Sequence, residues 1–78
     1  MQLEIVTPEN KLFSGDIKLV QLPGSKGSFE ILRNHAPIIS TLDIGIVKLI
    51  TMEGKEMQFE IKGGVVEASY NKIIVLAE

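Results

Sequence analysis

The chain has 78 residues, 45% of them hydrophobic, a formal net charge of −2 at pH 7 and no cysteine. This length allows one small domain whose apolar residues can supply a core, and the lack of cysteine excludes disulfides and thiolate metal sites and favours a reducing compartment. Seven scattered lysines and a single arginine form no basic run, which argues against nucleic acid or an anionic membrane as a direct ligand.

The N-terminal stretch MQLEIV lacks the basic and apolar regions of a signal peptide, and no apolar run approaches the roughly 20 residues of a membrane helix. Residues 3–6 (LEIV) instead have the composition of a β-strand. We expect a loop over 8–15, with a short strand or bulge around Leu12 and Phe13. A second strand is predicted over 16–22 (DIKLVQL), and its loss of alternation at Val20 indicates a bulge.

The next segment combines a turn signal with a strand signal. PGSKG (23–27) predicts a turn, and residues 28–32 follow as another short strand. GSKGS (24–28) is similar to a phosphate-binding loop only in its glycines, because the required spacing and a following helix are both missing. We therefore interpret these residues as a turn.

The second half of the chain has the clearest strand pattern. In EMQFEIK (56–62) apolar and polar residues alternate strictly, as on a strand with one buried face. Strands are also predicted for IGIVKLI (44–50) and KIIVLA (72–77), and the turn signals are EGKE (53–56), GG (63–64) and YN (70–71). No segment keeps a helical period over about ten residues, so the pattern predicts an all-β sandwich of roughly seven to ten short strands in two packed sheets.

Two of these strands, 44–50 and 72–77, are apolar on both faces, although a strand on a solvated sheet normally has one polar face. In one interpretation they are central strands whose outer face is covered by a loop. In the other, part of the outer face contacts another protein. A chain of this length has few residues that could provide such a cover.

The stretch FEILRNHAPIIS (29–40) contains the only histidine, His35, and the only arginine, Arg33. A Ser–His–Asp set could be assembled from Ser40 and Asp43, but no G-x-S-x-G motif surrounds a serine. One histidine among scattered carboxylates gives no metal-ligand spacing. We therefore interpret the stretch as a turn pinned by its Asn-His-Ala-Pro sequence, with exposed charges that form a docking rim.

Lys55, at the predicted hairpin tip, raises a further possibility, a biotinyl or lipoyl carrier domain. Such domains have Met-Lys-Met or Asp-Lys-Ala around the modified lysine, whereas here its neighbours are Gly54 and Glu56. A solvated lysine in a tight turn is the simpler interpretation. A free-standing β-sandwich interaction or carrier module stays open as the alternative function.

Residues 24–37 follow the pattern G-S-x-G-x-F-x-I-L-x-N-H-A-P, which resembles the N-terminal domain of the epsilon subunit of F-type ATP synthase. The resemblance extends over the whole chain, and it includes LEIVTPENKLFSGD (3–16), TLDIGIVKL (41–49), GG (63–64) and NKIIVLAE (71–78). Several motifs in the same order make the resemblance specific.

This resemblance implies one domain over residues 1–78, a ten-stranded β-sandwich without catalytic residues, metal or cofactor. It implies a rotor subunit that binds the gamma subunit and the c-ring and couples rotation, driven by protons or sodium ions, to ATP synthesis. One copy per complex would lie peripheral to the membrane, on the cytoplasmic face of a bacterial inner membrane. Typical family members continue into an inhibitory C-terminal helical hairpin, for which this chain, ending at Glu78, has no residues.

The resemblance also implies two sets of contact residues. Those facing the c-ring would be Lys26, Gly27, Ser28, Phe29, Glu30, Arg33 and Asn34. Those facing gamma would be Thr7, His35, Ala36 and Pro37. The family typically has Gly at the position of Glu30 and often Pro or another small residue at that of Arg33, so this chain departs from the family in the charge of its c-ring contact.

Overall fold

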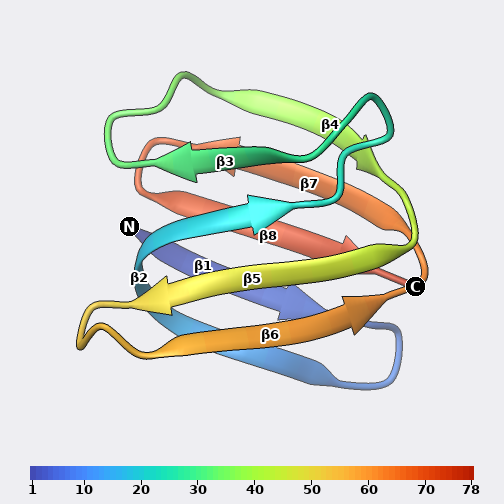
Figure 1. Ribbon diagram of the computed structural model, residues 1–78, viewed down its shortest axis with the longest axis horizontal. Coiled ribbons are helices and arrows are strands. Elements are labelled where there is room, and N and C mark those ends of the chain that lie inside the picture. The colour runs from blue at the N-terminus through green and yellow to red at the C-terminus, as the bar shows by residue number, and fades with distance from the viewer.

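The computed structural model describes residues 1–78 and contains eight β-strands and no helix (Figure 1). The strands are β1 (Gln2–Val6), β2 (Lys11–Leu22), β3 (Phe29–Leu32), β4 (Ile38–Leu42), β5 (Gly45–Thr51), β6 (Glu56–Ile61), β7 (Gly64–Ser69) and β8 (Lys72–Ala77). The structure therefore has no helix long and apolar enough to cross a membrane. The all-β prediction is confirmed, with eight strands in place of the ten implied by the resemblance.

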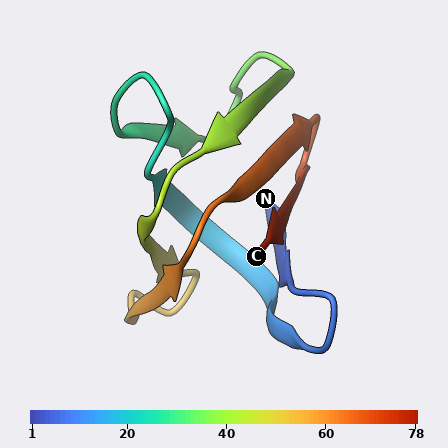
Figure 2. The ribbon, with the colours of Figure 1, turned by 90° about the vertical axis from the view of Figure 1, so that its right-hand side faces the viewer.

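The strands form one curled sheet in the order β4-β7-β8-β1-β2-β5-β6, and β3 pairs with β2 beside this path. Paired strands are antiparallel except β1 and β8, which run parallel. The sheet folds into two layers at β2, because the first half of this 12-residue strand pairs with β1 and the second half with β3 and β5 (Figure 2). We call the layer of β4, β7, β8 and β1 sheet A, and the layer of β3, β5 and β6 sheet B.

The core lies between the two sheets and consists of 15 buried hydrophobic side chains. In β8, Ile73 and Val75 are fully buried while their neighbours are not, so the strand alternates as expected for one core face. Phe13 of β2 and Phe59 of β6 pack against this core with ring centroids 6.0 Å apart. This aromatic pair connects the two layers at the edge of sheet B.

Three expectations for the first half of the chain are corrected by the structure. β2 begins at Lys11, so part of the segment expected to be a loop is a strand that pairs with β1, while the register shift at Leu12 agrees with the bulge expected there. A second irregularity of β2 lies between Ile17 and Leu19, and Val20, where the bulge was expected, is an ordinary buried strand residue. The sequence pattern also does not predict β4, which forms an edge of the sheet beside β7.

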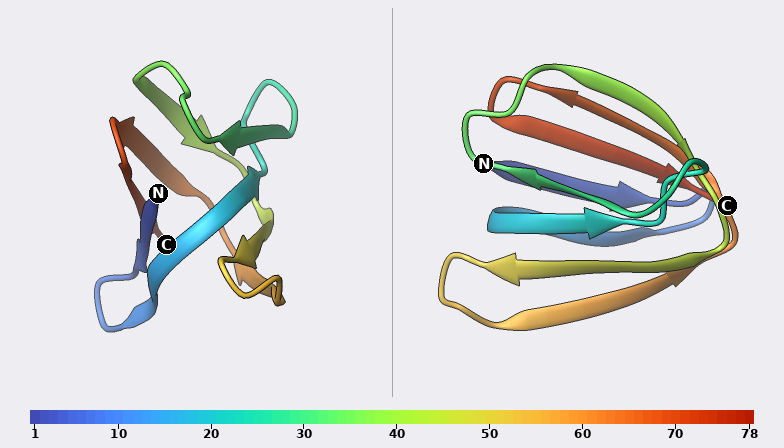
Figure 3. Two further views of the ribbon diagram at one scale, coloured as in Figure 1. Left: turned by 90° about the vertical axis from the view of Figure 1, so that its left-hand side faces the viewer. Right: turned by 45° about the horizontal axis from the view of Figure 1, so that its top comes forward.

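The connections gather at the two ends of the strands (Figures 1 and 3). One end, called the Lys26 end, lies on the right of Figure 1 and carries the connections 7–10, 23–28, 43–44 and 62–63 and the residue Glu78. The opposite end, called the Arg33 end, carries the connections 33–37, 52–55 and 70–71, together with Met1 and the bend of β2 near Ile17. The predicted contact residues are distributed between these ends.

Candidate docking surfaces

The residues predicted to face the c-ring do not form one cluster in the structure. Residues 26–28 lie in the β2–β3 connection at the Lys26 end, and β3 carries Phe29 and Glu30. Arg33 and Asn34 follow β3 at the Arg33 end. Because β3 runs from one end to the other, a planar partner can contact only one half of this set.

The loop at the Lys26 end is held by hydrogen bonds to the end of β4 and to the β4–β5 connection. The Ser25 amide donates to the Thr41 carbonyl at 3.1 Å, and the Ser25 hydroxyl donates to Asp43 Oδ1 at 3.2 Å. The Thr41 hydroxyl donates to the Ser25 hydroxyl oxygen at 3.0 Å. A Cβ at Gly24 would lie 2.6 Å from the Gly27 carbonyl oxygen, so this glycine permits the tight return of the chain. The loop therefore presents Lys26 on a fixed support.

The residues predicted to face gamma are also divided between the two ends. Thr7 lies at the Lys26 end, where its hydroxyl accepts a hydrogen bond from the Asn10 amide at 3.0 Å. The segment 35–37 lies at the Arg33 end, after Asn34, whose φ of 67° lies in the left-handed region that asparagine tolerates. His35 Nδ1 lies 3.0 Å from the Ala36 carbonyl oxygen, and its Nε2 is buried without a hydrogen-bond partner.

The outer face of sheet A carries an apolar row that no part of the chain covers, beside a mixed row in which Ile74 lies between Glu4 and Glu67. Val65 of β7 pairs with Leu76 of β8, and Leu76 pairs with Val6 of β1, so these three side chains form one row across the sheet. Leu76 is 55% exposed, and Ile39 of edge strand β4 is 73% exposed. We call the residues Val6, Ile39, Val65, Ile74 and Leu76 the sheet A face. For residues 72–77 the structure thus excludes a covering loop.

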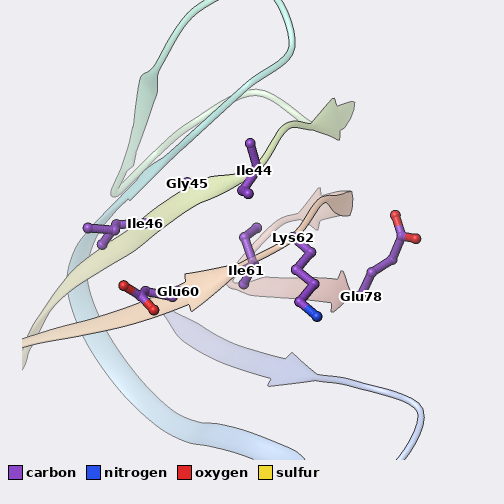
Figure 4. A pocket seen from close by; sticks show the side chains of 7 residues that line it. All are labelled: Ile44, Gly45, Ile46, Glu60, Ile61, Lys62 and Glu78. Carbon is purple, nitrogen blue, oxygen red and sulfur yellow. The ribbon is translucent and has the colours of Figure 1, made fainter.

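The outer face of sheet B is more polar. Lys48 lies 3.8 Å from Glu56, and this pair sits between strands β5 and β6. Its exposed apolar residues lie near both ends: Leu32 at the Arg33 end is 51% exposed, and Ile46 near the Lys26 end is 48% exposed. There Ile44, Ile46 and Ile61, with Gly45, Glu60, Lys62 and Glu78, line an open cavity of about 420 Å³ (Figure 4).

The residues considered for catalysis or modification are not arranged for chemistry. His35 Nδ1 lies beside a backbone carbonyl, and the Ser40 hydroxyl donates to the Thr41 carbonyl at 3.2 Å. No three His, Asp or Glu side chains lie close enough together to hold a metal ion. Lys55 is exposed in the β5–β6 turn, and its amide donates to the Thr51 hydroxyl at 3.0 Å.

Sequence reasoning missed two members of the sheet A face, Ile39 and Val65. The sequence pattern gave little indication of these two residues, because apolar and polar residues alternate over only about two pairs in each of the short strands β4 and β7. Ile39 and Thr41 point outward in β4, while Leu42 is buried. Only the pairing of β4 with β7 shows that Ile39 lies on the same outer face as Ile74, with Glu67 between them.

Comparison with known proteins gives a consistent result. The family model described as "ATP synthase, Delta/Epsilon chain, beta-sandwich domain" matches residues 1–78. The chain is 46% identical over 76 residues to the ATP synthase epsilon chain of Pelotomaculum thermopropionicum, covering 97% of this chain and 56% of the relative. It is 45% identical over 78 residues to that of Campylobacter fetus, covering all of this chain and 60% of the relative. The epsilon chain of Chlorobaculum tepidum is 45% identical, with 97% of this chain and 86% of the relative covered.

Two solved structures have the same fold. A chain of the mitochondrial ATP synthase of Euglena gracilis, solved with F1 and the c-ring, matches with a TM-score of 0.86 at 16% identity, covering 96% of this chain and 48% of that one. A chain of the central stalk and c-ring of the Tetrahymena thermophila enzyme matches with a TM-score of 0.78 at 18% identity, covering 99% and 62%.

Proposed function

Because the chain belongs to the family of the ATP synthase delta/epsilon chain beta-sandwich domain, we propose that it is a non-catalytic subunit of a rotary ATP synthase. In this role it binds the gamma subunit and the c-ring in the central stalk and couples ion-driven rotation to ATP synthesis. Support comes from the relatives, which are named ATP synthase epsilon chain, and from structural neighbours solved in stalk and c-ring assemblies. One copy per complex would lie on the cytoplasmic face of a bacterial inner membrane, with protons or sodium ions as the coupling ion.

The observation that carries the proposal is the uncovered sheet A face, which we assign to gamma. The apolar row of Val6, Leu76 and Val65 has the composition of the core of a protein interface, and Glu4 and Glu67 in the neighbouring row supply a charged border. Thr7 directly follows β1, at one end of this face, and Pro37 directly precedes β4 at the other. The residues predicted to face gamma therefore border the same surface from opposite corners.

We assign the c-ring contact to the Lys26 end. The hydrogen bonds of Ser25 to Thr41 and Asp43 hold the Lys26 loop in one conformation, which lowers the entropy cost of binding. Lys26, Gly27 and Ser28 would contact the ring, with Phe29 and Glu30 behind them. In this orientation Arg33 and Asn34 lie at the far end and face away from the ring.

The experiment that tests this assignment is binding to purified gamma subunit by the full chain and two variants. Leu76→Glu places a charge at the centre of the sheet A face, so we expect affinity for gamma to fall at least about tenfold, which corresponds to about 1.4 kcal/mol. Ile46→Glu is the matched control, because Ile46 is similarly exposed but lies on sheet B. Thermal unfolding of both variants shows that the fold is intact.

Two outcomes count against the proposal. If the unaltered chain does not bind gamma, the assignment to the central stalk fails. If Ile46→Glu abolishes binding while Leu76→Glu leaves it unchanged, gamma docks on sheet B and the assignment of the sheet A face is wrong.

A further inference from the structure

The charged residues are distributed unevenly between the two ends of the molecule. Of the eight Lys and Arg side chains, Lys11 pairs with Glu4 at 3.9 Å and Lys48 pairs with Glu56 at 3.8 Å. The other six form no ion pair, and four of these lie at or next to the Arg33 end, namely Lys18, Arg33, Lys55 and Lys72. Only two unpaired carboxylates accompany them, those of Asp16 and Glu53. A molecule with a net charge of −2 thus has one end with an excess of positive charge.

This end also contains a concave surface. A cavity of about 390 Å³ opens there between the bend of β2, the residue after β3 and the β5–β6 turn. Its lining combines Ile17 and the half-exposed Met52 with Lys18, Arg33 and Asn71. Ile17 is only 1% exposed, so Met52 supplies the apolar contact of this cavity, with the cationic side chains of Lys18 and Arg33 beside it.

We propose that this cavity binds a short acidic segment of a partner protein, with an apolar side chain against Met52 and carboxylates at Lys18 and Arg33. The guanidinium of Arg33 presents a planar fork that matches a carboxylate, and no carboxylate of this chain occupies it. The contact of an apolar side chain with Met52 fixes the register of the segment, while the cations supply attraction and steering. The proposal does not depend on which partner occupies the Lys26 end or the sheet A face.

A protein segment fits these observations better than an anionic membrane does. A flat bilayer could not fill a concave cavity, and the net charge of −2 opposes approach to a negatively charged surface. Asp16, which also lines the cavity, would repel lipid phosphates packed around it. A single extended peptide can instead place its carboxylates beside Lys18 and Arg33 and away from Asp16.

The test is an NMR titration of the full ¹⁵N-labelled chain with a short glutamate-rich peptide that contains two isoleucines. We expect shifts of the backbone amides of Lys18, Arg33, Met52 and Asn71, and weaker binding as salt is added, because these charges are exposed and screened. Arg33→Glu and Lys18→Glu should each lower the affinity about fivefold. Lys26→Glu is the matched control, since it makes the same change of charge at the opposite end.

Several results would overturn the proposal. It fails if the peptide causes no shifts, if its lysine-rich counterpart binds as well, or if Lys26→Glu weakens binding as much as Arg33→Glu does. Binding of vesicles containing phosphatidylserine, with the same residues shifted and no response to the peptide, would assign the surface to a membrane instead. Because all three variants change exposed side chains, thermal unfolding serves only to confirm equal folding.

Discussion

Replacing Gly64 by alanine should destabilise the domain strongly, because the added Cβ would cause both backbone strain and a steric clash. Gly64 has a φ of 146°, a backbone conformation that L side chains rarely adopt. A Cβ at this position would lie well inside van der Waals contact with the Leu76 carbonyl oxygen and 3.0 Å from Ala77 Cα. Backbone strain of roughly 1–2 kcal/mol and overpacking of roughly 1–3 kcal/mol give a loss of about 3 kcal/mol.

For a domain of this length, a loss of about 3 kcal/mol lowers the melting temperature by roughly 12–24 °C. Thermal unfolding followed by circular dichroism measures this directly. Gly54→Ala is the matched control, because Gly54 has a φ of 89° but a Cβ there would meet nothing within 4 Å. That variant should lose only the backbone part, about 1–2 kcal/mol. If Gly64→Ala melts no lower than Gly54→Ala, the close approach of β7 and β8 does not limit this position and the reasoning is refuted.

Two further predictions concern the core and the Lys26 loop. Leu49→Ala should lower the free energy of unfolding, measured in urea, by about 2–5 kcal/mol because Leu49 is fully buried. The same change at half-exposed Leu76 should lower it by less than about 1.5 kcal/mol. Equal losses would contradict the assignment of inner and outer faces. Asp43→Ala removes the acceptor of the Ser25 hydroxyl, so we expect about 1 kcal/mol lower stability and faster hydrogen exchange at the Ser25 amide. Unchanged exchange at this amide would show that other contacts hold the loop.

Much of the local structure could be predicted from the sequence, because it depends on side-chain alternation and on turn residues. Strand β8 coincides with the predicted 72–77, and β6 with the strictly alternating residues 56–61. Asn34 and Asn71 both adopt the positive φ that asparagine tolerates, each at a turn. The motifs of residues 24–37 also indicate the family, which the comparisons confirm.

Other features could not be predicted, because they depend on contacts between residues far apart in the chain. The segment 11–15 has only two apolar residues and contains Gly15, yet it is a strand because β1 lies beside it and Phe13 packs against Phe59. β4 has no strong pattern of its own and is defined by its pairing with β7. A short edge strand of this kind gains its stability from a neighbour that the local sequence does not identify.

The all-β class and the alternation of individual strands could be recognised from residues that are close together in the chain, and the family from motifs in the same order along it. Which apolar faces stay uncovered and which charges share an end of the molecule depends on the tertiary fold, because the fold brings together residues that are distant in the sequence. The parallel pair of β1 and β8 joins Val6 to Leu76 from opposite ends of the sequence and completes the sheet A face. The four residues of β3, which span about 13 Å when extended, place Lys26 and Arg33 at opposite ends although they are close in sequence.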